Sequence, residues 1–164
     1  MSLVYAVSVY TKLNMDLPPE WVTAFTALRE AGESATVEFP DLPEDLAGEG
    51  TGREIAGLIR SPRYETKPTY DFGKCVDHLK GGVEHCTYHL SFWNLVLDDL
   101  FYHPGYAFLM FLARYNEGNR FVGTICETYS SVPDLIYFLE GQLEIVKLKD
   151  GGSELGKIPD SVSF

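Results

Sequence analysis

The sequence predicts an α+β fold, a single domain with a mainly antiparallel sheet of about four to six strands and two or three packed helices. Several segments are rich in β-branched and aromatic residues, which favour strands. Three others begin with helix-start signals. The chain has 164 residues, 45% of them apolar, which is enough for one core without a disulfide or metal. We expect this domain to span 1–150, followed by a loosely held tail over 151–164.

The N-terminal half is predicted to hold a strand, two helices and a loop. A proline pair starts the first helix, and Trp21, Phe25 and Leu28 follow at helical spacing. Thr51 and Glu54 match a capping box, which predicts the start of the second helix. The predicted elements are a strand over 3–10, a helix over 18–31, a short strand-like run over 35–39, a loop over 40–50 and a helix over 52–60.

The C-terminal half is predicted to hold more strands and one helix. Residues 106–115 are apolar throughout, which is typical of a strand covered on both faces. With 120–129 they flank a short loop containing Asn and Gly, which predicts a β-hairpin. The other predicted elements are a strand over 86–93, a helix from Ser131 to Gly141 and a strand, slightly favoured over helix, at 142–149; 61–74 stay unassigned.

The charge of the chain predicts the class of its partner. There are 24 acidic residues against 13 Lys and Arg, a formal net charge of −11. Such a chain repels nucleic acid and anionic lipid, so we expect neither a nucleic-acid nor a membrane partner. It attracts a basic protein. The three cysteines, without a recognisable secretion signal, favour a reduced, cytoplasmic location.

The acidic residues concentrate near the N-terminus, where we place the first candidate site. The first fifty residues contain nine acids and two bases. Charged groups steer association, and apolar groups among them hold a bound partner. The alternative interpretation is a solvated loop without a role. The predicted partner-binding residues are Glu38, Asp41, Leu42, Glu44, Asp45 and Glu49.

A second candidate is a zinc site in the His/Cys-rich segment 75–103. Cys75 with His78 and Cys86 with His89 form two matching pairs, and two thiolates with two imidazoles suit tetrahedral zinc. The spacing opposes this, because Cys86 and His89 on a strand would face opposite ways. The main expectation is therefore a protein without a cofactor.

A third group of hypotheses concerns catalysis by a small hydrolase or transferase. Either Cys86 or Cys126 could act as a nucleophile beside a histidine. A set of acid and base groups could also converge at one edge of the sheet, made of Asp98, Asp99, His103 and Glu127. The sequence contains none of the common motifs for a serine nucleophile, a phosphate loop or a metalloprotease.

The charge and the missing motifs favour a protein that binds and inhibits another protein, more than an enzyme. In size, acidity and fold class the chain is similar to immunity proteins that neutralise bacterial toxins. That similarity implies a basic toxin or effector as the partner. The alternatives are a small enzyme, a zinc-binding domain, or a subunit of an assembly such as a homodimer.

Overall fold

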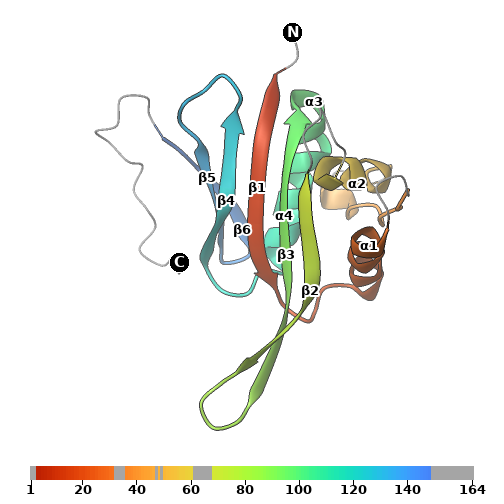
Figure 1. Cartoon of the computed structure of the whole chain (residues 1–164), viewed down its shortest axis with the longest axis vertical. Coiled ribbons are helices and arrows are strands. Elements are labelled where there is room, and N and C mark those ends of the chain that lie inside the picture. Colours follow the sequence, from red (N-terminus) through yellow and green to blue (C-terminus); the bar gives the residue numbers. More distant parts are fainter. Residues whose placement is uncertain (1–2, 32–35, 47, 49, 61–67, 149–164) are drawn as a thin grey trace.

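The computed structural model describes residues 3–31, 36–46, 48, 50–60 and 68–148. The strands in these ranges form one antiparallel six-stranded sheet with the order β2-β3-β1-β4-β5-β6 (Figure 1). This confirms the predicted α+β fold. The strands are β1 (Val4–Leu13), β2 (Thr69–His78), β3 (Glu84–Leu97), β4 (Arg120–Glu127), β5 (Asp134–Leu139) and β6 (Gln142–Lys147).

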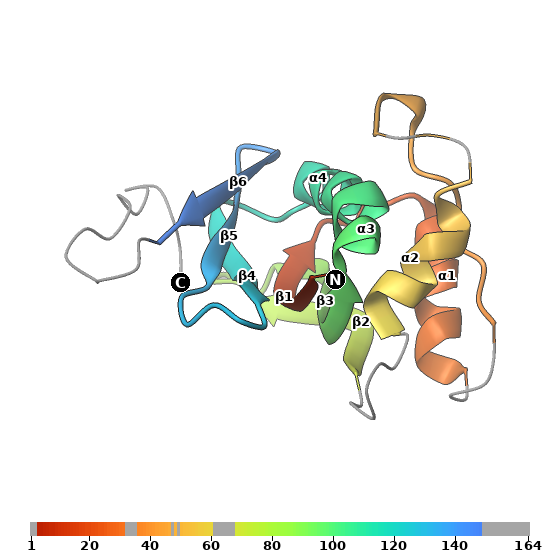
Figure 2. The same cartoon turned by 90° about the horizontal axis from the view of Figure 1, so that it is seen from above.

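The helices lie on one side of this sheet, which we call the helix face (Figure 2). The other side, called the open face, carries no helix among the described residues. The helical elements are α1 (Pro19–Glu30), α2 (Gly52–Arg60), α4 (Tyr106–Arg114) and the short turns η1 (Glu44–Leu46), α3 (Asp98–Leu100) and η2 (Phe101–Gly105).

The core lies between the helices and the helix face, and aromatic rings fill much of it. The ring centroids of Trp21 in α1 and Phe111 in α4 are 4.3 Å apart. Phe25 in α1 lies 5.0 Å from Phe72 in β2. Each buried ring removes a large apolar area from water, so these contacts hold α1 and α4 to each other and to the sheet.

Strands β2 and β3 continue beyond the rest of the sheet as a two-stranded arm (Figure 1). The pairing of β1 with β3 ends at Tyr88, whereas the pairing of β2 with β3 continues to Glu84. Two contacts tie the arm to the body: Lys12 Nζ lies 3.3 Å from Asp77 Oδ2, and His85 Nε2 lies 2.7 Å from Glu117 Oε1.

Most predicted elements are present. The first strand is confirmed and runs on to Leu13, and α1 and α2 match the predicted helices over 18–31 and 52–60. The strands predicted at 86–93, 120–129 and 142–149 correspond to β3, β4 and β6. Part of the unassigned stretch 61–74 contributes the start of β2.

The strand predicted at 106–115 is wrong, because Tyr106–Arg114 form helix α4. An apolar run of this length suits a buried helix as well as a buried strand. In the structure α4 crosses the middle of the helix face, where it is covered on most sides, and Phe108 reaches the ring of Phe92 in β3. The predicted hairpin is therefore a helix followed by strand β4.

The helix predicted from Ser131 to Gly141 is also wrong, because Asp134–Leu139 form strand β5. Gly141 does not end a helix. It follows Glu140 in a two-residue turn to β6, and both have positive φ, 50° and 75°. Such a turn is typical of a tight β-hairpin. Ile136 and Phe138 then point toward the core.

Two further predictions fall near the described boundaries. Residues 36–39 of the strand-like run 35–39 form no strand, and Ala35 lies outside the described residues. The predicted tail over 151–164 also lies outside them. Within the described ranges, no helix has the length and apolar character needed to cross a membrane.

Candidate functional site

Among the described residues of the segment 38–50, which carries the predicted partner-binding acids, three apolar side chains lie in the core. Leu42 is 2% exposed, and Phe39 and Leu46 are buried with it. The ring of Phe39 lies 5.7 Å from that of Trp21 in α1. The prediction that Leu42 is an exposed partner contact is therefore wrong: it fixes the loop to the core, because burying its side chain is more favourable than exposing it.

Asp41 has a structural contact at the start of α2. Its Oδ1 accepts a hydrogen bond of 2.9 Å from the amide of Gly52. Hydrogen bonds from the amides of Gly52 and Gly50 lower the pKa of this carboxyl. The predicted cap residue, Thr51, instead bonds within the loop to Gly48 and Leu42. Asp41 thus satisfies an amide that the helix itself leaves unpaired.

The other predicted acids differ in their contacts. Asp45 pairs with Arg114 at the end of α4, and this pairing lowers the pKa of Asp45. Glu38 and Glu44 are exposed, and neither forms an ion pair with any described residue. Glu49 lies outside the described residues.

The four predicted zinc ligands do not come together. Gly73 pairs with His89 and Cys75 with Thr87, which places Cys75 and His89 on the open face. His78 is separated from Cys75 by an odd number of residues along β2, and Cys86 from His89 by an odd number along β3. His78 and Cys86 therefore point to the opposite side of the sheet. Within the described ranges, no three or more His, Cys, Asp or Glu residues gather closely enough to hold a metal ion.

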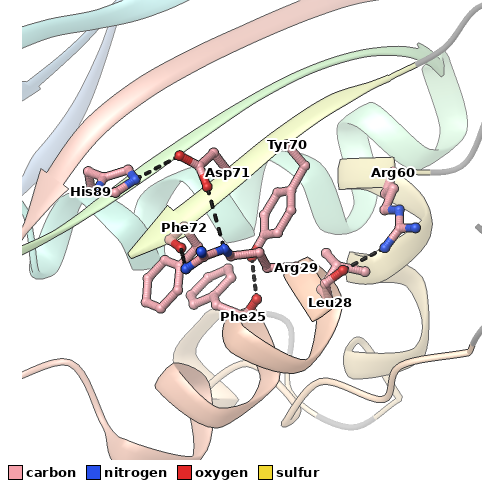
Figure 3. Close-up of polar contacts among 8 residues, drawn as sticks. All are labelled: Phe25, Leu28, Arg29, Arg60, Tyr70, Asp71, Phe72 and His89. Carbon is pink, nitrogen blue, oxygen red and sulfur yellow. Dashed lines mark hydrogen bonds and ion pairs between the residues drawn. The ribbon is translucent and has the colours of Figure 1, made fainter. Parts of the chain in front are cut away.

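The open face instead holds a network around Asp71 at the edge of the sheet (Figure 3). His89 Nε2 lies 3.0 Å from Asp71 Oδ2, and this contact is the largest cause that lowers the pKa of Asp71. Arg29 reaches from α1 toward the same carboxylate, with Nε 3.8 Å from Oδ1, and donates a 3.2 Å bond to the carbonyl of Phe72. The network therefore joins α1 to the edge strand β2.

A second set of bonds holds the end of α1, and Figure 3 draws those to Phe25 and Leu28. Arg60, in the last turn of α2, donates to the carbonyls of Leu28 and Ala31 at 2.5 and 2.9 Å. Tyr70 donates a 2.7 Å bond to the carbonyl of Phe25, and burial raises the pKa of this phenol. These groups satisfy or share carbonyls near the helix terminus, which indicates a structural role.

The proposed nucleophilic thiols show no catalytic geometry. All three cysteines are free and half-buried. The thiol of Cys126 contacts the backbone carbonyls of Glu127 and Ser130, each at 3.5 Å. Among the described residues, no hydrogen bond links Cys86 or Cys126 to a histidine. The nucleophile hypothesis thus gains no contact from the fold.

A polar cavity of about 340 Å³ lies at one end of the sheet, beside η2. Tyr5 comes from β1 and Tyr102 from η2, and their hydroxyls are 3.1 Å apart. Glu127 comes from the end of β4 and Asp134 from the start of β5. The remaining lining residues are Ile125, Ser130, Val132, Lys147 and Leu148.

The surroundings raise the pKa of Tyr5 and of Tyr106 in this region. The hydrogen bond with Tyr102 is the main cause that raises the pKa of Tyr5, and burial and the charges of Glu127 and Asp98 add to it. Burial raises the pKa of nearby Tyr106, with contributions from Tyr102 and Asp134. The carboxylates of Glu127, Asp98 and Asp134 therefore lie near enough to act on these phenols.

The predicted convergence of carboxylates is found only in part. Glu127 lines the cavity, and Asp98 is near enough to act on Tyr5. Asp99 and His103 are not among the lining residues. Sequence reasoning missed Asp134 because it placed this residue on a helix.

The comparisons with known proteins add no relative: no family model, curated protein or solved structure matches the chain.

Proposed function

We propose that this chain is an acidic protein that binds a basic protein partner and inhibits or escorts it, as an immunity protein does with a toxin or effector. The contact is made through an acidic surface, defined here as Asp16, Glu20, Glu38, Asp41, Glu44 and Asp45. All six side chains belong to exposed residues.

The observation that carries the proposal is the fixed presentation of these carboxylates. Trp21 packs against both Phe39 and Phe111, so the start of α1, the loop and α4 are neighbours. The buried Leu42 and the bond from Gly52 to Asp41 hold the loop in place. A loop that is ordered before binding loses less conformational entropy when it meets a partner.

The balance of charge supports the same conclusion. Within this surface only Asp45 forms an ion pair with a described residue, namely Arg114. Asp41 also accepts the bond from Gly52, which leaves Asp16, Glu20, Glu38 and Glu44 to attract a basic protein. Such attraction raises the association rate and weakens with salt.

Isothermal titration against the product of the neighbouring gene tests the proposed function. We expect a complex at micromolar concentration, and the absence of binding would overturn the proposal. The surface is tested with a triple variant that removes charges without structural contacts, Glu20→Gln, Glu38→Gln and Glu44→Gln. Its association rate at low salt should fall by about tenfold.

A matched triple variant, Glu84→Gln, Glu140→Gln and Glu144→Gln, removes the same charge from exposed positions elsewhere. Its association rate should change by less than about twofold, because charges outside the contact act only through the overall field. An equal effect of the two triple variants would contradict the assignment of the surface.

A further inference from the structure

We propose that the cavity lined by Tyr5, Tyr102, Glu127 and Asp134 binds a guanidinium group. This site shares no residue with the acidic surface, and the inference does not depend on the proposed function.

Two carboxylates line the cavity against one cationic side chain, that of Lys147. Glu127 and Asp134 are both half-buried, and neither forms an ion pair with any described residue. Lys147 pairs with Asp134 across β5 and β6, but its ammonium group forms no ion pair within 4.0 Å with a described carboxylate. Partly desolvated carboxylates without a partner are unfavourable, and a bound cation would remove that cost.

The tyrosine rings favour an organic cation over a metal ion. Tyr102 is 58% exposed, so part of its ring is open to a ligand. Its ring lies edge-on to that of Tyr5, with the centroids 5.9 Å apart. The raised pKa of Tyr5 keeps this phenol neutral, and neutral aromatic faces attract cations.

A guanidinium group matches this arrangement better than an ammonium group. It is planar, stacks on aromatic faces and offers five donors, so one group can serve both carboxylates. An ammonium group is more strongly hydrated, so it loses more hydration free energy when it enters the cavity. The volume of about 340 Å³ admits the end of an arginine side chain.

The test titrates the full chain with three small probes. Binding is monitored through the backbone amide NMR signals of Glu127, Ser130 and Asp134. N-acetyl-L-arginine amide should give saturable shifts with a dissociation constant of about 1 mM. N-acetyl-L-citrulline amide, a neutral isostere, should bind at least about tenfold more weakly. Free L-arginine distinguishes the source: tighter binding than the amide indicates the free amino acid, and equal or weaker binding indicates an arginine of a polypeptide.

Variants locate the binding. The double variant Glu127→Gln and Asp134→Asn should bind N-acetyl-L-arginine amide at least about tenfold more weakly. The double variant Glu140→Gln and Glu144→Gln should keep the dissociation constant within about twofold of that of the unmodified chain. The inference is overturned by absence of saturation up to about 10 mM arginine amide, by equal binding of citrulline, or by shifts confined to other residues. Because the probe comparison uses the unmodified chain, it decides the question even where the cavity variant fails to fold.

Discussion

The imidazole of His89 lies directly over Gly73, its partner across β2 and β3, and its Nε2 is 3.0 Å from Asp71 Oδ2. A methyl group at Gly73 would stand 2.9 Å from Cε1 of this ring. The absence of a side chain at Gly73 thus makes room for the contact between His89 and Asp71, on a face of the sheet that none of the described helices covers (Figure 3).

Replacing Gly73 with Ala should displace the ring of His89 from Asp71. The pKa of Asp71 should then rise toward its ordinary value of 3.8, because the hydrogen bond from His89 is the main cause that lowers it. Arg29 stays in place, so the rise should be incomplete. The free energy of unfolding should change by less than about 1 kcal/mol, because losing an exposed ion pair costs little and replacing a glycine inside a strand is favourable by about 0.5–1 kcal/mol.

An NMR titration of the Asp71 carboxyl group measures this effect. Gly57→Ala serves as the control, because no atom lies within 4 Å of the added methyl group. That substitution should leave the pKa of Asp71 unchanged and stabilise α2 by about 0.5–1 kcal/mol. An unchanged pKa of Asp71 in Gly73→Ala would show that the ring does not depend on the space above Gly73.

Two lysine substitutions test whether 106–114 is a helix. Met110 is 42% exposed, whereas Leu112 is fully buried. Met110→Lys should change the free energy of unfolding by less than about 0.5 kcal/mol. Leu112→Lys should cost at least about 3 kcal/mol, because it buries an unpaired charge. On a strand these two residues would share one face, so equal effects in chemical denaturation would contradict α4.

Sequence pattern was sufficient where periodicity and end signals agreed. Helix α1 is predicted by its proline pair and by apolar residues at helical spacing, and α2 by a capping pattern. The sequence pattern gave the wrong element type for α4 and β5. Both are apolar on nearly every side, so their periodicity cannot distinguish a helix from a strand. Only packing against the sheet decides between these forms.

The candidate sites were predicted less well than the fold. The acids of the loop were identified by composition alone, but Leu42 was assigned to the surface although it belongs to the core. The cavity joins Tyr5, Tyr102 and the nearby pair Glu127 and Asp134, which come from three distant parts of the chain. Without the strand order, no local spacing indicates that such residues meet. Glu127 alone had been considered, as one carboxylate at a sheet edge.

Arg60 should be more important for stability than its neighbour Arg53. Arg60 donates to the carbonyls of Leu28 and Ala31 at the end of α1, whereas Arg53 is exposed in the same helix. Arg60→Ala should lower the free energy of unfolding by about 1–3 kcal/mol, because hydrogen bonds from charged donors are lost. Arg53→Ala should change it by less than about 0.5 kcal/mol. Equal losses in urea denaturation would refute the role of Arg60.

The contact of Asp41 with α2 should make stability depend on pH in the acid range. The amides of Gly52 and Gly50 lower the pKa of Asp41 below its ordinary 3.8. The folded form therefore holds this carboxylate more strongly than the unfolded form does. The stabilisation is complete above the ordinary pKa and is lost as the pH falls through the lowered pKa of the folded state.

Asp41→Ala should therefore lower the thermal midpoint of unfolding at neutral pH, because α2 loses the acceptor for its first amide. The difference from the unmodified chain should stay constant from about pH 8 to about pH 5 and narrow below about pH 4. Glu38→Gln removes a charge from an exposed residue near Asp41 that forms no ion pair with any described residue. If the difference in thermal midpoint between Glu38→Gln and the unmodified chain narrows in the same way, the acid dependence arises from the charge of the loop. It then does not arise from the bond between Asp41 and Gly52.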